Sequence, residues 1–588
     1  MASLPLDSPH WDLSLLYPPD SPALSQDVAK LRELSQSFGR WRAPLASPDF
    51  APARFKELLD ELLALEELAS KVSGYASLFL AQDNSSQKAL SLNATVDDLL
   101  ADLANDTLFF ELWWKNLPAE KSAPYLAVAP EISHYLQKTR SFQPYTLSEK
   151  EEKAIKLKDS REQLTTLYET LNSRLSFTLK APGREERPLS REELSVYFRS
   201  PDPQEREAAY REFYRVFERE GPILGLLYQF MARNWRNENL RLRSFSKPIS
   251  ARNLLNDLPD EAVATLLEVA EREVPRVFGR YFDLKAKILG LPKLRRYDLY
   301  APLLGSAGEP RPFAEGLEEV ARAFRAFSPL MEELALKVPR EKRLSGQILA
   351  GKQSGAFCSS FMPRDVPWVL MSYQGRRQDL FTLAHELGHA VHSQLAAPRG
   401  LWQFEASLPL AETASTFGEM LLYRNLKKRE TDPAARRDLL FHLLDDAYAT
   451  VGRQAYFALF EEEAHSLAAD GATVDEIAEA YFRNLERQFG DHLDLAPEFR
   501  WEWVAIPHFY RTPFYVYAYS FGQLLVYSLW KRYEEEGESF VPKLLGILGR
   551  GASASPAAIL AEAGVGPLDA RFWEGGFAAL EGFLAELG

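Results

Sequence analysis

The sequence predicts a predominantly helical protein that is organised in two lobes. Apolar residues recur at the three- and four-residue spacing of amphipathic helices through most of the chain, for example in residues 55–65, 260–290 and 435–468. Short segments rich in proline, glycine and aspartate, which end helices, separate these stretches. At 588 residues the chain is also much longer than one hydrophobic core usually supports, so we expect at least two lobes.

The composition is that of a globular protein and argues against a nucleic-acid partner. The chain has 46% hydrophobic and 26% charged residues, and its 69 Lys and Arg against 83 Asp and Glu give a net charge of −14. Nucleic-acid binding depends on lysine and arginine side chains that neutralise phosphates. We therefore expect neither DNA nor RNA as a partner.

A single cysteine, Cys358, excludes an internal disulfide bond and a cysteine-rich metal site, and it fits a reducing compartment. The first 20 residues contain no lysine or arginine, which a secretory signal requires. No apolar run reaches the roughly 18 residues that span a bilayer. We expect a cytoplasmic protein with no membrane partner.

Two stretches interrupt the helical pattern and predict small hairpins. Residues 176–180 (SFTLK), followed by Pro182 and Gly183, indicate the first. Residues 357–361 and 368–373, on either side of a turn-rich segment, indicate the second. The first hairpin and the helix break near residue 200 predict a boundary between an N-terminal helical lobe, 1–195, and a catalytic domain, 196–588.

Residues 385–389 (HELGH) contain the pattern of a catalytic metal site. An apolar stripe at helical spacing predicts that the motif lies on a helix: Leu380, Leu383, Ala384, Leu387, Val391 and Leu395. Four residues of a helix advance by about 400°, so His385 and His389 point the same way and can share one metal ion. Glu386 is turned by about 100° and can take a proton from a metal-activated water without being a ligand. The alternative is that these residues are only the polar face of an amphipathic helix. Glycine inside a helix lowers its stability by about 1 kcal/mol relative to alanine. Gly388 therefore predicts that another segment approaches the helix closely there.

A catalytic zinc ion needs a third protein ligand. The metzincin pattern would place a histidine at position 395, which is Leu395, so that subclass is excluded. Glu412 follows His389 by 23 residues and shares one helix face with Glu419. We predict Glu412 as the third ligand and Glu419 as the partner that supports a ligand histidine. The alternative for each carboxylate is an ordinary surface glutamate.

These motifs resemble the oligoendopeptidase F branch of the thimet-oligopeptidase (M3) family of zinc peptidases. The resemblance covers residues 382–392 (TLAHELGHAVH), 411–419 (AETASTFGE), 11–17 (WDLSLLY), 284–290 (LKAKILG), 297–302 (YDLYAP) and 514–519 (FYVYAY), and so extends nearly end to end. It implies an almost wholly helical fold in which two lobes enclose a deep channel. It also implies that the substrates are short peptides.

In the wider family, a histidine and tyrosines near the C-terminal motif bind the scissile carbonyl. The histidine carries over to His508, but the tyrosine spacing departs from the better-known branch by a residue or more. Of Tyr510, Tyr515, Tyr517 and Tyr519 we favour Tyr515 and Tyr519, one helical turn apart, with Tyr517 as an open alternative. The competing interpretation is that these tyrosines are core aromatics.

The second hairpin predicts a peptide-binding edge, because an extended peptide can add to an exposed strand through main-chain hydrogen bonds. We expect Gly355, Ala356 and Tyr373 to line this edge, and Tyr517 to contact the substrate as well. The alternative is a structural hairpin that covers the helix with the HELGH motif.

Together these residues predict an endopeptidase that hydrolyses oligopeptides with one Zn²⁺ per chain and Glu386 as the general base. One alternative is a helical zinc carboxypeptidase, which must also bind a terminal carboxylate. Another is a catalytically silent peptide-binding protein. The sequence predicts neither the cleavage preference nor the oligomeric state.

Overall fold

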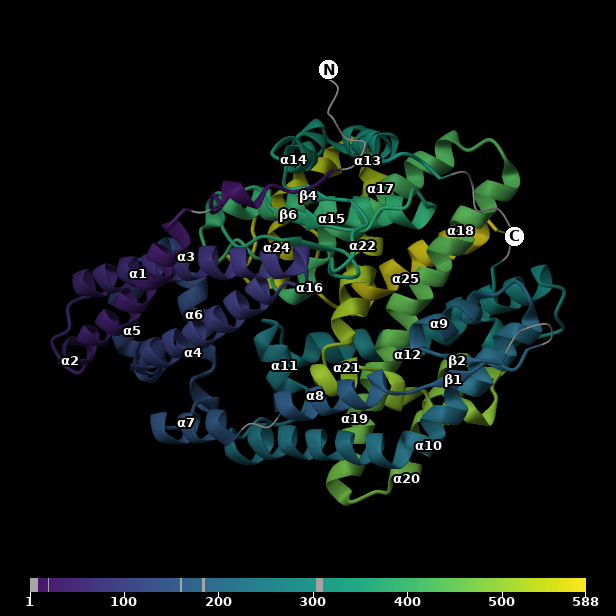
Figure 1. Ribbon diagram of the computed structural model, residues 1–588, viewed down its shortest axis with the longest axis horizontal. Coiled ribbons are helices and arrows are strands. Elements are labelled where there is room, and N and C mark those ends of the chain that lie inside the picture. The colour runs from purple at the N-terminus through teal and green to yellow at the C-terminus, as the bar shows by residue number, and fades with distance from the viewer. Residues whose placement is uncertain (1–8, 20, 159–160, 182–185, 303–309, 588) are drawn as a thin grey trace. The chain divides into compact units, whose positions relative to one another are not determined.

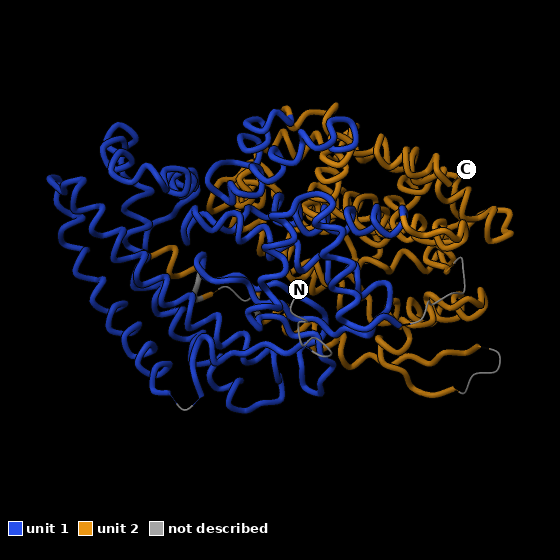
Figure 2. The backbone as a smooth tube through the Cα atoms, turned by 90° about the horizontal axis from the view of Figure 1, so that it is seen from above, with its two compact units in different colours: residues 1–149, 307–428, 533–565 blue, residues 150–306, 429–532, 566–588 orange. Residues whose placement is uncertain are grey.

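The structure is a computed structural model that describes residues 9–19, 21–158, 161–181, 186–302 and 310–587. It confirms the predominantly helical fold, since the strands are only two or three residues long (Figure 1). The chain forms two compact units (Figure 2). Unit 1 contains residues 1–149, 307–428 and 533–565, and unit 2 contains residues 150–306, 429–532 and 566–588. None of the described helices combines the length and apolar character that a membrane span requires.

Unit 1 contains two groups of α-helices and one sheet. Its α-helices are α1 (Ala23–Phe38), α2 (Arg42–Leu45), α3 (Pro52–Gln82), α4 (Gln87–Asn116), α5 (Ala119–Ala127), α6 (Ser133–Ser141), α13 (Phe313–Phe327), α14 (Pro329–Arg340), α15 (Arg377–Ala396), α16 (Leu408–Ala411), α17 (Thr413–Arg429), α23 (Val541–Leu548) and α24 (Pro556–Glu562). Its 3₁₀ helices are η1 (Leu13–Leu15), η2 (Gly39–Trp41), η3 (Pro130–Ile132), η4 (Gln143–Tyr145), η8 (Ala397–Arg399) and η12 (Gly537–Phe540). Its strands are β4 (Leu344–Ser345), β5 (Phe357–Ser359) and β6 (Trp368–Leu370).

Unit 2 is built around long helices. Its α-helices are α7 (Glu149–Lys158), α8 (Arg161–Ser173), α9 (Arg191–Ser195), α10 (Pro203–Arg236), α11 (Ser250–Leu255), α12 (Asp260–Ile288), α18 (Pro433–Ala447), α19 (Arg453–Asp470), α20 (Val474–Phe489), α21 (His508–Arg511), α22 (Tyr517–Glu536), whose last turn belongs to unit 1, and α25 (Ala570–Ala585). Its other helices are the 3₁₀ segments η5 (Val196–Arg199), η7 (Arg296–Asp298), η10 (Gly490–His492) and η11 (Pro497–Ala505) and the π segments η6 (Asn237–Leu242) and η9 (Tyr448–Gly452). Its strands are β1 (Phe177–Thr178), β2 (Pro188–Leu189), β3 (Leu294–Arg295) and β7 (Leu493–Asp494).

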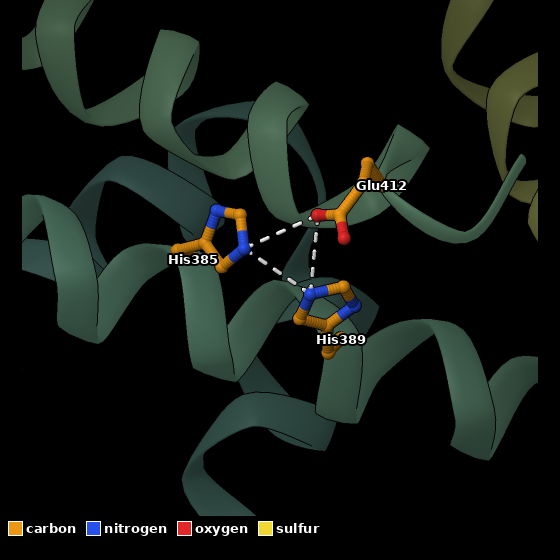
Figure 3. A group of neighbouring side chains, drawn as sticks. All are labelled: His385, His389 and Glu412. Carbon is orange, nitrogen blue, oxygen red and sulfur yellow. Dashed lines mark hydrogen bonds and ion pairs between the residues drawn. The ribbon is translucent and has the colours of Figure 1, made fainter. Parts of the chain in front are cut away.

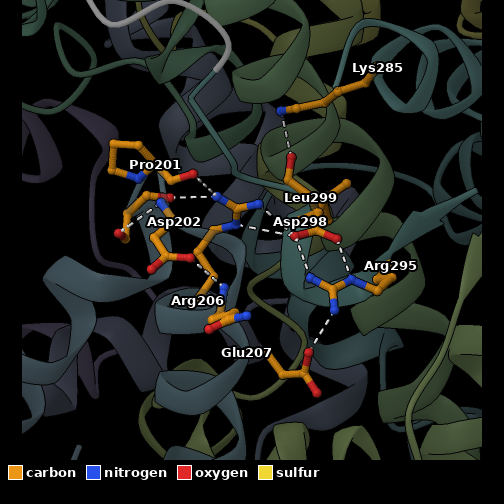
Figure 4. Close-up of polar contacts among 10 residues, drawn as sticks. Pro201, Asp202, Arg206, Glu207, Lys285, Arg295, Asp298 and Leu299 are labelled. Atoms are coloured by element: carbon orange, nitrogen blue, oxygen red, sulfur yellow. Dashed lines mark hydrogen bonds and ion pairs between the residues drawn. The ribbon is translucent and has the colours of Figure 1, made fainter. Parts of the chain in front are cut away.

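The compact units differ from the predicted domains 1–195 and 196–588, because residue 195 lies inside unit 2. The helix break at residue 200 is a turn that Arg206 anchors within that unit (Figure 4). Arg206 Nη1 donates to the carbonyls of Ser200 and Pro201 at 2.6 and 3.0 Å, and its Nη2 donates to Asp298 Oδ1 at 2.7 Å. A local break in the helical pattern therefore marks a turn here and not the edge of a compact unit.

The middle segment of the family resemblance forms a buried ion-pair network in unit 2 (Figure 4). Asp298 is fully buried and also accepts a hydrogen bond from Arg295 Nε at 2.6 Å. Burial alone would raise the pKa of Asp298, but the hydrogen bonds from Arg295 and Arg206 outweigh it and lower the pKa. Lys285, also fully buried, donates to the carbonyl of Leu299 at 2.6 Å. These charges hold α10, α12 and the segment after β3 together.

Both predicted hairpins are confirmed. β1 and β2 pair antiparallel, with Phe177 opposite Leu189, and the predicted turn residues 182 and 183 lie outside the described residues. β5 and β6 pair antiparallel, with Cys358 opposite Val369. β4 pairs parallel to the other side of β6, so β5 is an edge strand. The β4 segment has too few residues to show an alternating pattern, and the sequence did not predict it. Nor did the sequence predict the parallel pair of β3 and β7.

The opening segment of the chain supports this small sheet in unit 1. The Trp11 ring packs edge-on against Trp368 of β6, with ring centroids 6.0 Å apart. Lys352 Nζ links the segments that follow β4 and β6, because it donates hydrogen bonds to the carbonyls of Gln347 and Met371 at 2.6 and 2.7 Å. α15 contacts both β5 and β6. The edge strand is thereby fixed beside the helix that carries the HELGH motif.

Candidate metal centre

The HELGH motif lies on α15, as its apolar pattern predicts. The residues of the predicted stripe are buried, apart from Leu395, which is half-buried: Leu380, Leu383, Ala384, Leu387 and Val391. Burial of this stripe anchors the helix in unit 1, and His385 and His389 are only half-buried. The helix thus holds both imidazoles on a face that is open to a ligand.

Three potential ligand atoms meet above this helix (Figure 3). The Nε2 atoms of His385 and His389 are 3.2 Å apart, and Glu412 Oε2 is 3.2 Å from the first and 3.3 Å from the second. Ligand atoms that lie about 2.0–2.1 Å from a tetrahedral zinc ion are roughly 3.3 Å from one another. Among the described residues, this is the one group of at least three His, Cys, Asp or Glu side chains that converge in this way. The donor set and its spacing fit a zinc ion.

The close approach that Gly388 predicts is confirmed. A Cβ atom at Gly388 would lie 2.6 Å from the backbone oxygen of Ala414 and 2.6 Å from the Cα of Ser415. A Cβ atom at Gly418 of α17 would likewise lie 3.1 Å from the backbone oxygen of Ala384. α15 and α17 therefore cross almost backbone to backbone, and this crossing brings Glu412 to the histidines.

Two side chains of α17 orient the candidate ligands. The Nδ1–H of His385 donates to Glu419 Oε1 at 2.6 Å, so Nε2 is the ring nitrogen that faces the centre. The Ser415 hydroxyl donates to Glu412 Oε2 at 2.8 Å. Glu419 thus contacts a histidine of the candidate centre, where we expected its support. Ser415 was not assigned a role from the sequence, although its three-residue spacing from Glu412 places it on the same helix face.

The charges around the two imidazoles favour a cation. Burial would raise the pKa of the Glu412 carboxyl, but His385 and His389 outweigh burial and hold this pKa far below its usual range. Burial would lower the pKa of His385, but its hydrogen bonds with Glu412 and Glu419 outweigh burial and raise it. Both shifts reflect the attraction between the carboxylates and the imidazoles, so the centre stabilises positive charge.

The candidate centre opens into a cavity of about 420 Å³. The cavity is lined by Ala356, Phe357, Cys358, Ser360, His385, Glu386, His389, His392, Ser393, Phe404, Glu405, Ala406, Ala411 and Glu412. Glu386 is 6% exposed, and burial raises the pKa of its carboxyl. A raised pKa suits a carboxylate that must take up a proton near neutral pH.

The edge strand supplies one wall of this cavity. Ala356 lines it, as do Phe357 and Cys358 of β5, whereas Gly355 is exposed beside them with φ of +87°.

The predicted position of Tyr373 differs from the observed one. Its ring packs on Phe313 of α13, with centroids 5.1 Å apart, and it does not line the cavity.

His392 and Glu405 are among the cavity residues that were not predicted from the sequence. His392 is buried one turn beyond His389, and burial lowers its pKa to about 4, so its imidazole is neutral. The helical spacing of His392 from His385 and His389 was the available signal. Glu405 lies in the loop between η8 and α16, where no periodic pattern points to it.

A second group of polar aromatic side chains lies in unit 2. The Tyr519 hydroxyl is 3.4 Å from His508 Nε2, and the Tyr515 ring lies 5.2 Å from that of Tyr519 and 6.2 Å from that of His508. All three side chains are half-exposed. Burial, and then the charges of Arg453 and Arg511, lower the pKa of His508. Its imidazole is therefore neutral at pH 7 and keeps one N–H donor.

The other two tyrosines of the predicted set are core residues. Tyr510 has no exposed surface, and its hydroxyl donates to the carbonyl of Leu224 at 3.2 Å. Tyr517 also has no exposed surface, and its hydroxyl accepts a hydrogen bond from Asn256 Nδ2 at 2.7 Å. This geometry does not support the predicted contact of Tyr517 with a substrate, because its buried hydroxyl is used within the core.

Buried contacts hold the turn that carries Tyr515. Phe514 has φ of +57°, a left-handed conformation that large side chains rarely adopt. Its N–H donates to Glu461 Oε1 at 2.9 Å, and Arg252 Nε donates to the carbonyl of Pro513 at 3.1 Å. The strained backbone is therefore fixed from two sides.

The chain is similar to known peptidases over most of its length. Residues 349–578 match peptidase family M3. "Oligopeptidase PepF" of Bacillus subtilis is 27% identical over 94% of this chain and 83% of that protein. "Oligoendopeptidase F, plasmid" of Lactococcus lactis subsp. cremoris is 26% identical over 90% of this chain and 89% of that protein. The crystal structure of oligoendopeptidase-F from Enterococcus faecium has the same fold, with a TM-score of 0.73, 24% identity, and coverage of 96% of this chain and 98% of that one.

The fold, the candidate centre and these similarities define the class of the protein, which is a peptidase. Residues 349–578 match peptidase family M3, and the predicted resemblance to the oligoendopeptidase F branch is confirmed.

Replacing Gly388 with alanine tests the helix crossing. The added Cβ would overlap the backbone of α17, so the two helices must separate and Glu412 must move away from the histidines. We expect a lower Tm and a zinc affinity that falls by about tenfold or more, as measured by thermal unfolding and by competition with a chelator.

The matched control is Gly546→Ala in α23, where a Cβ has open space around it. Alanine there should leave zinc affinity unchanged and stabilise the helix by up to about 1 kcal/mol. A Gly388→Ala protein that binds zinc as tightly as the wild type would contradict the crossing.

The buried carboxyl of Glu461 predicts a pH dependence of stability. Burial raises its pKa from an ordinary 4.5 to about 8, with neutral His465 4.0 Å away and Arg252 acting in the opposite direction. Because the folded-state pKa is the higher one, the protonated carboxyl stabilises the fold below pH 4.5, and this stabilisation is lost as the pH rises to about 8. Glutamine cannot ionise, and its carbonyl can still accept the Phe514 N–H. We expect Glu461→Gln to match the wild-type Tm near pH 5 and exceed it by on the order of 5 °C at pH 9.

Calorimetry of both proteins between pH 5 and pH 9 measures this difference. Parallel curves of Tm against pH would show that Glu461 does not titrate in this range.

Proposed function

We propose that the protein is a zinc-dependent endopeptidase that hydrolyses oligopeptides. The observation that carries the proposal is the triangle of His385 Nε2, His389 Nε2 and Glu412 Oε2, with edges of 3.2, 3.2 and 3.3 Å. The relatives named as oligopeptidase and oligoendopeptidase F support the substrate class. Each chain would hold one zinc ion through these three side chains.

A bound zinc ion supplies Lewis acidity, which polarises the peptide carbonyl and lowers the pKa of water toward 7. The protein's own residues do the rest. Glu386 takes the proton of the attacking water and passes it to the leaving amine. Its burial at the cavity wall supports this role, since a desolvated carboxylate is a stronger base. Glu419 keeps the His385 ring in the tautomer that presents Nε2.

The scissile carbonyl needs hydrogen-bond donors as negative charge develops on its oxygen. In this proposal His508, Tyr515 and Tyr519 supply them, as the family resemblance implies. Their half-exposed side chains, their mutual contacts and the neutral imidazole of His508 support this assignment. Tyr510 and Tyr517 are excluded from it by their burial.

The edge strand β5 fits the binding of an extended peptide. One side of β5 pairs with β6, and the other side has no strand partner among the described residues. Main-chain hydrogen bonds to Gly355, Ala356 or β5 would bind peptides of many sequences next to the centre. We further propose that the enzyme acts in the cytoplasm, because a single cysteine fits a reducing compartment.

The substitution Glu386→Gln tests the mechanism. Glutamine keeps the shape of the side chain but cannot take up a proton. We expect the variant to bind one zinc ion per chain, measured by elemental analysis, while kcat on a fluorogenic peptide falls by at least about 10³-fold.

The control is Glu333→Gln, which removes one carboxylate from the exposed face of α14 and should leave kcat and zinc content unchanged. Substantial hydrolysis by zinc-loaded Glu386→Gln would refute the assignment of the base.

A digest of peptides amidated at the C-terminus separates the endopeptidase from a carboxypeptidase. We expect internal cleavage of amidated and free peptides alike, read as fragments by mass spectrometry. Release of single C-terminal residues from the free peptides alone would support the carboxypeptidase, and stoichiometric zinc without turnover would support the silent binding protein.

A further inference from the structure

One carboxylate in the cavity wall has no role in the proposed mechanism. Glu405 lines the cavity together with His385, His389 and Glu412. In the part of the chain that the structure describes, no residue forms a hydrogen bond or an ion pair with its side chain. The described residues therefore supply no counter-charge for this group.

The other charged groups of the cavity do not compensate Glu405. The lining contains no lysine or arginine, and its other carboxylates belong to Glu386 and Glu412. His392 is neutral, since burial lowers its pKa to about 4. Glu405 is exposed to solvent, although neighbouring atoms that displace part of its water raise the pKa of its carboxyl. A positive group that enters the cavity can therefore reach this carboxylate and pair with it.

The backbone that leads to Glu405 is also fixed in position. The preceding Phe404 is 2% exposed, and its N–H donates to the carbonyl of Gly400 at 3.0 Å. The carbonyl of Gln403 accepts a hydrogen bond from the N–H of Ala552 at 2.7 Å. The two residues before Glu405 are therefore held by hydrogen bonds to Gly400 and to Ala552. A carboxylate on a fixed backbone can discriminate between ligands without a large cost in conformational entropy.

We propose that Glu405 is a specificity residue that selects peptides with a cationic group, the ammonium of lysine or the guanidinium of arginine, close to the bond that is cleaved. This inference rests on the proposed peptidase site, because the same cavity holds Glu386 and the candidate zinc ligands. The free amino terminus of a peptide has the same ammonium chemistry, so the test must separate these two sources.

The test uses peptides amidated at the C-terminus, in which norleucine is replaced by lysine at one position at a time. One set is acetylated at the N-terminus, and a matched set has a free amino terminus. Lysine and norleucine have similar lengths and differ chiefly in charge. We expect lysine at one or two neighbouring positions to raise kcat/KM by about fivefold, mainly through KM. This advantage should shrink as ionic strength rises, because salt screens the pair.

Two variants of Glu405 and one control complete the experiment. Glu405→Gln should bring the ratio of kcat/KM for the lysine and norleucine peptides close to one, and Glu405→Lys should reverse it in favour of a glutamate peptide. The control, Glu333→Gln, also removes one negative charge, but at an exposed position outside the cavity lining. It should keep the wild-type ratio of kcat/KM for the two peptides. A purely structural role of Glu405 would instead lower kcat for all peptides alike.

The outcomes separate the two proposals. If the zinc-loaded wild type hydrolyses none of the peptides, the proposed function fails. If it hydrolyses lysine and norleucine peptides equally well, or if Glu405→Gln keeps the lysine advantage, the specificity role alone is overturned. An advantage that appears only in peptides with a free amino terminus would also overturn the assignment to a basic side chain.

Discussion

The candidate site depends on one packing constraint, the close crossing of α15 and α17. At Gly388 the backbone of α17 occupies the space where any other residue would place a Cβ atom. This contact sets the distance between the two histidines of α15 and Glu412, which immediately precedes α17. The same crossing brings Glu419 to His385, so one helix pair supplies the candidate ligands and their orientation. A peptidase centre of this kind needs donors placed to within a few tenths of an ångström, and direct backbone contact provides that precision.

Unit 2 positions its polar aromatic residues by a different means, which is hydrogen bonding between ionisable side chains and the backbone. Glu461 and Arg252 hold the turn around Phe514 in a conformation that its side chain disfavours. Asp298 and Lys285 make charged contacts deeper in the same unit. Breaking buried pairs of this kind leaves uncompensated charges, which is strongly destabilising. Each unit thus fixes its candidate site residues through interactions that tolerate little rearrangement.

The sequence alone predicted the parts of the structure that local patterns encode. The apolar stripe of α15 predicted the helix, and Gly388 predicted the close contact. The triad of His385, His389 and Glu412 was predicted from spacing and meets in the structure, although its role as a zinc site stays a proposal.

Features that depend on distant contacts were not predictable in this way. The helix break at residue 200 resembled a domain boundary, yet Arg206 ties it into unit 2. Tyr517 is buried whereas Tyr519 is half-exposed. The hydroxyl of Tyr517 is bound in the core by Asn256, 261 positions away in the chain. Glu405 lies in an irregular loop, whose position near the cavity no periodicity encodes.

The central claim is that nitrogen and oxygen atoms alone bind one zinc ion at the helix crossing. X-ray absorption at the zinc edge of the purified protein tests it most directly: we expect nitrogen and oxygen neighbours at about 2.0–2.2 Å, and a sulfur shell near 2.3 Å or the absence of bound zinc would contradict the claim.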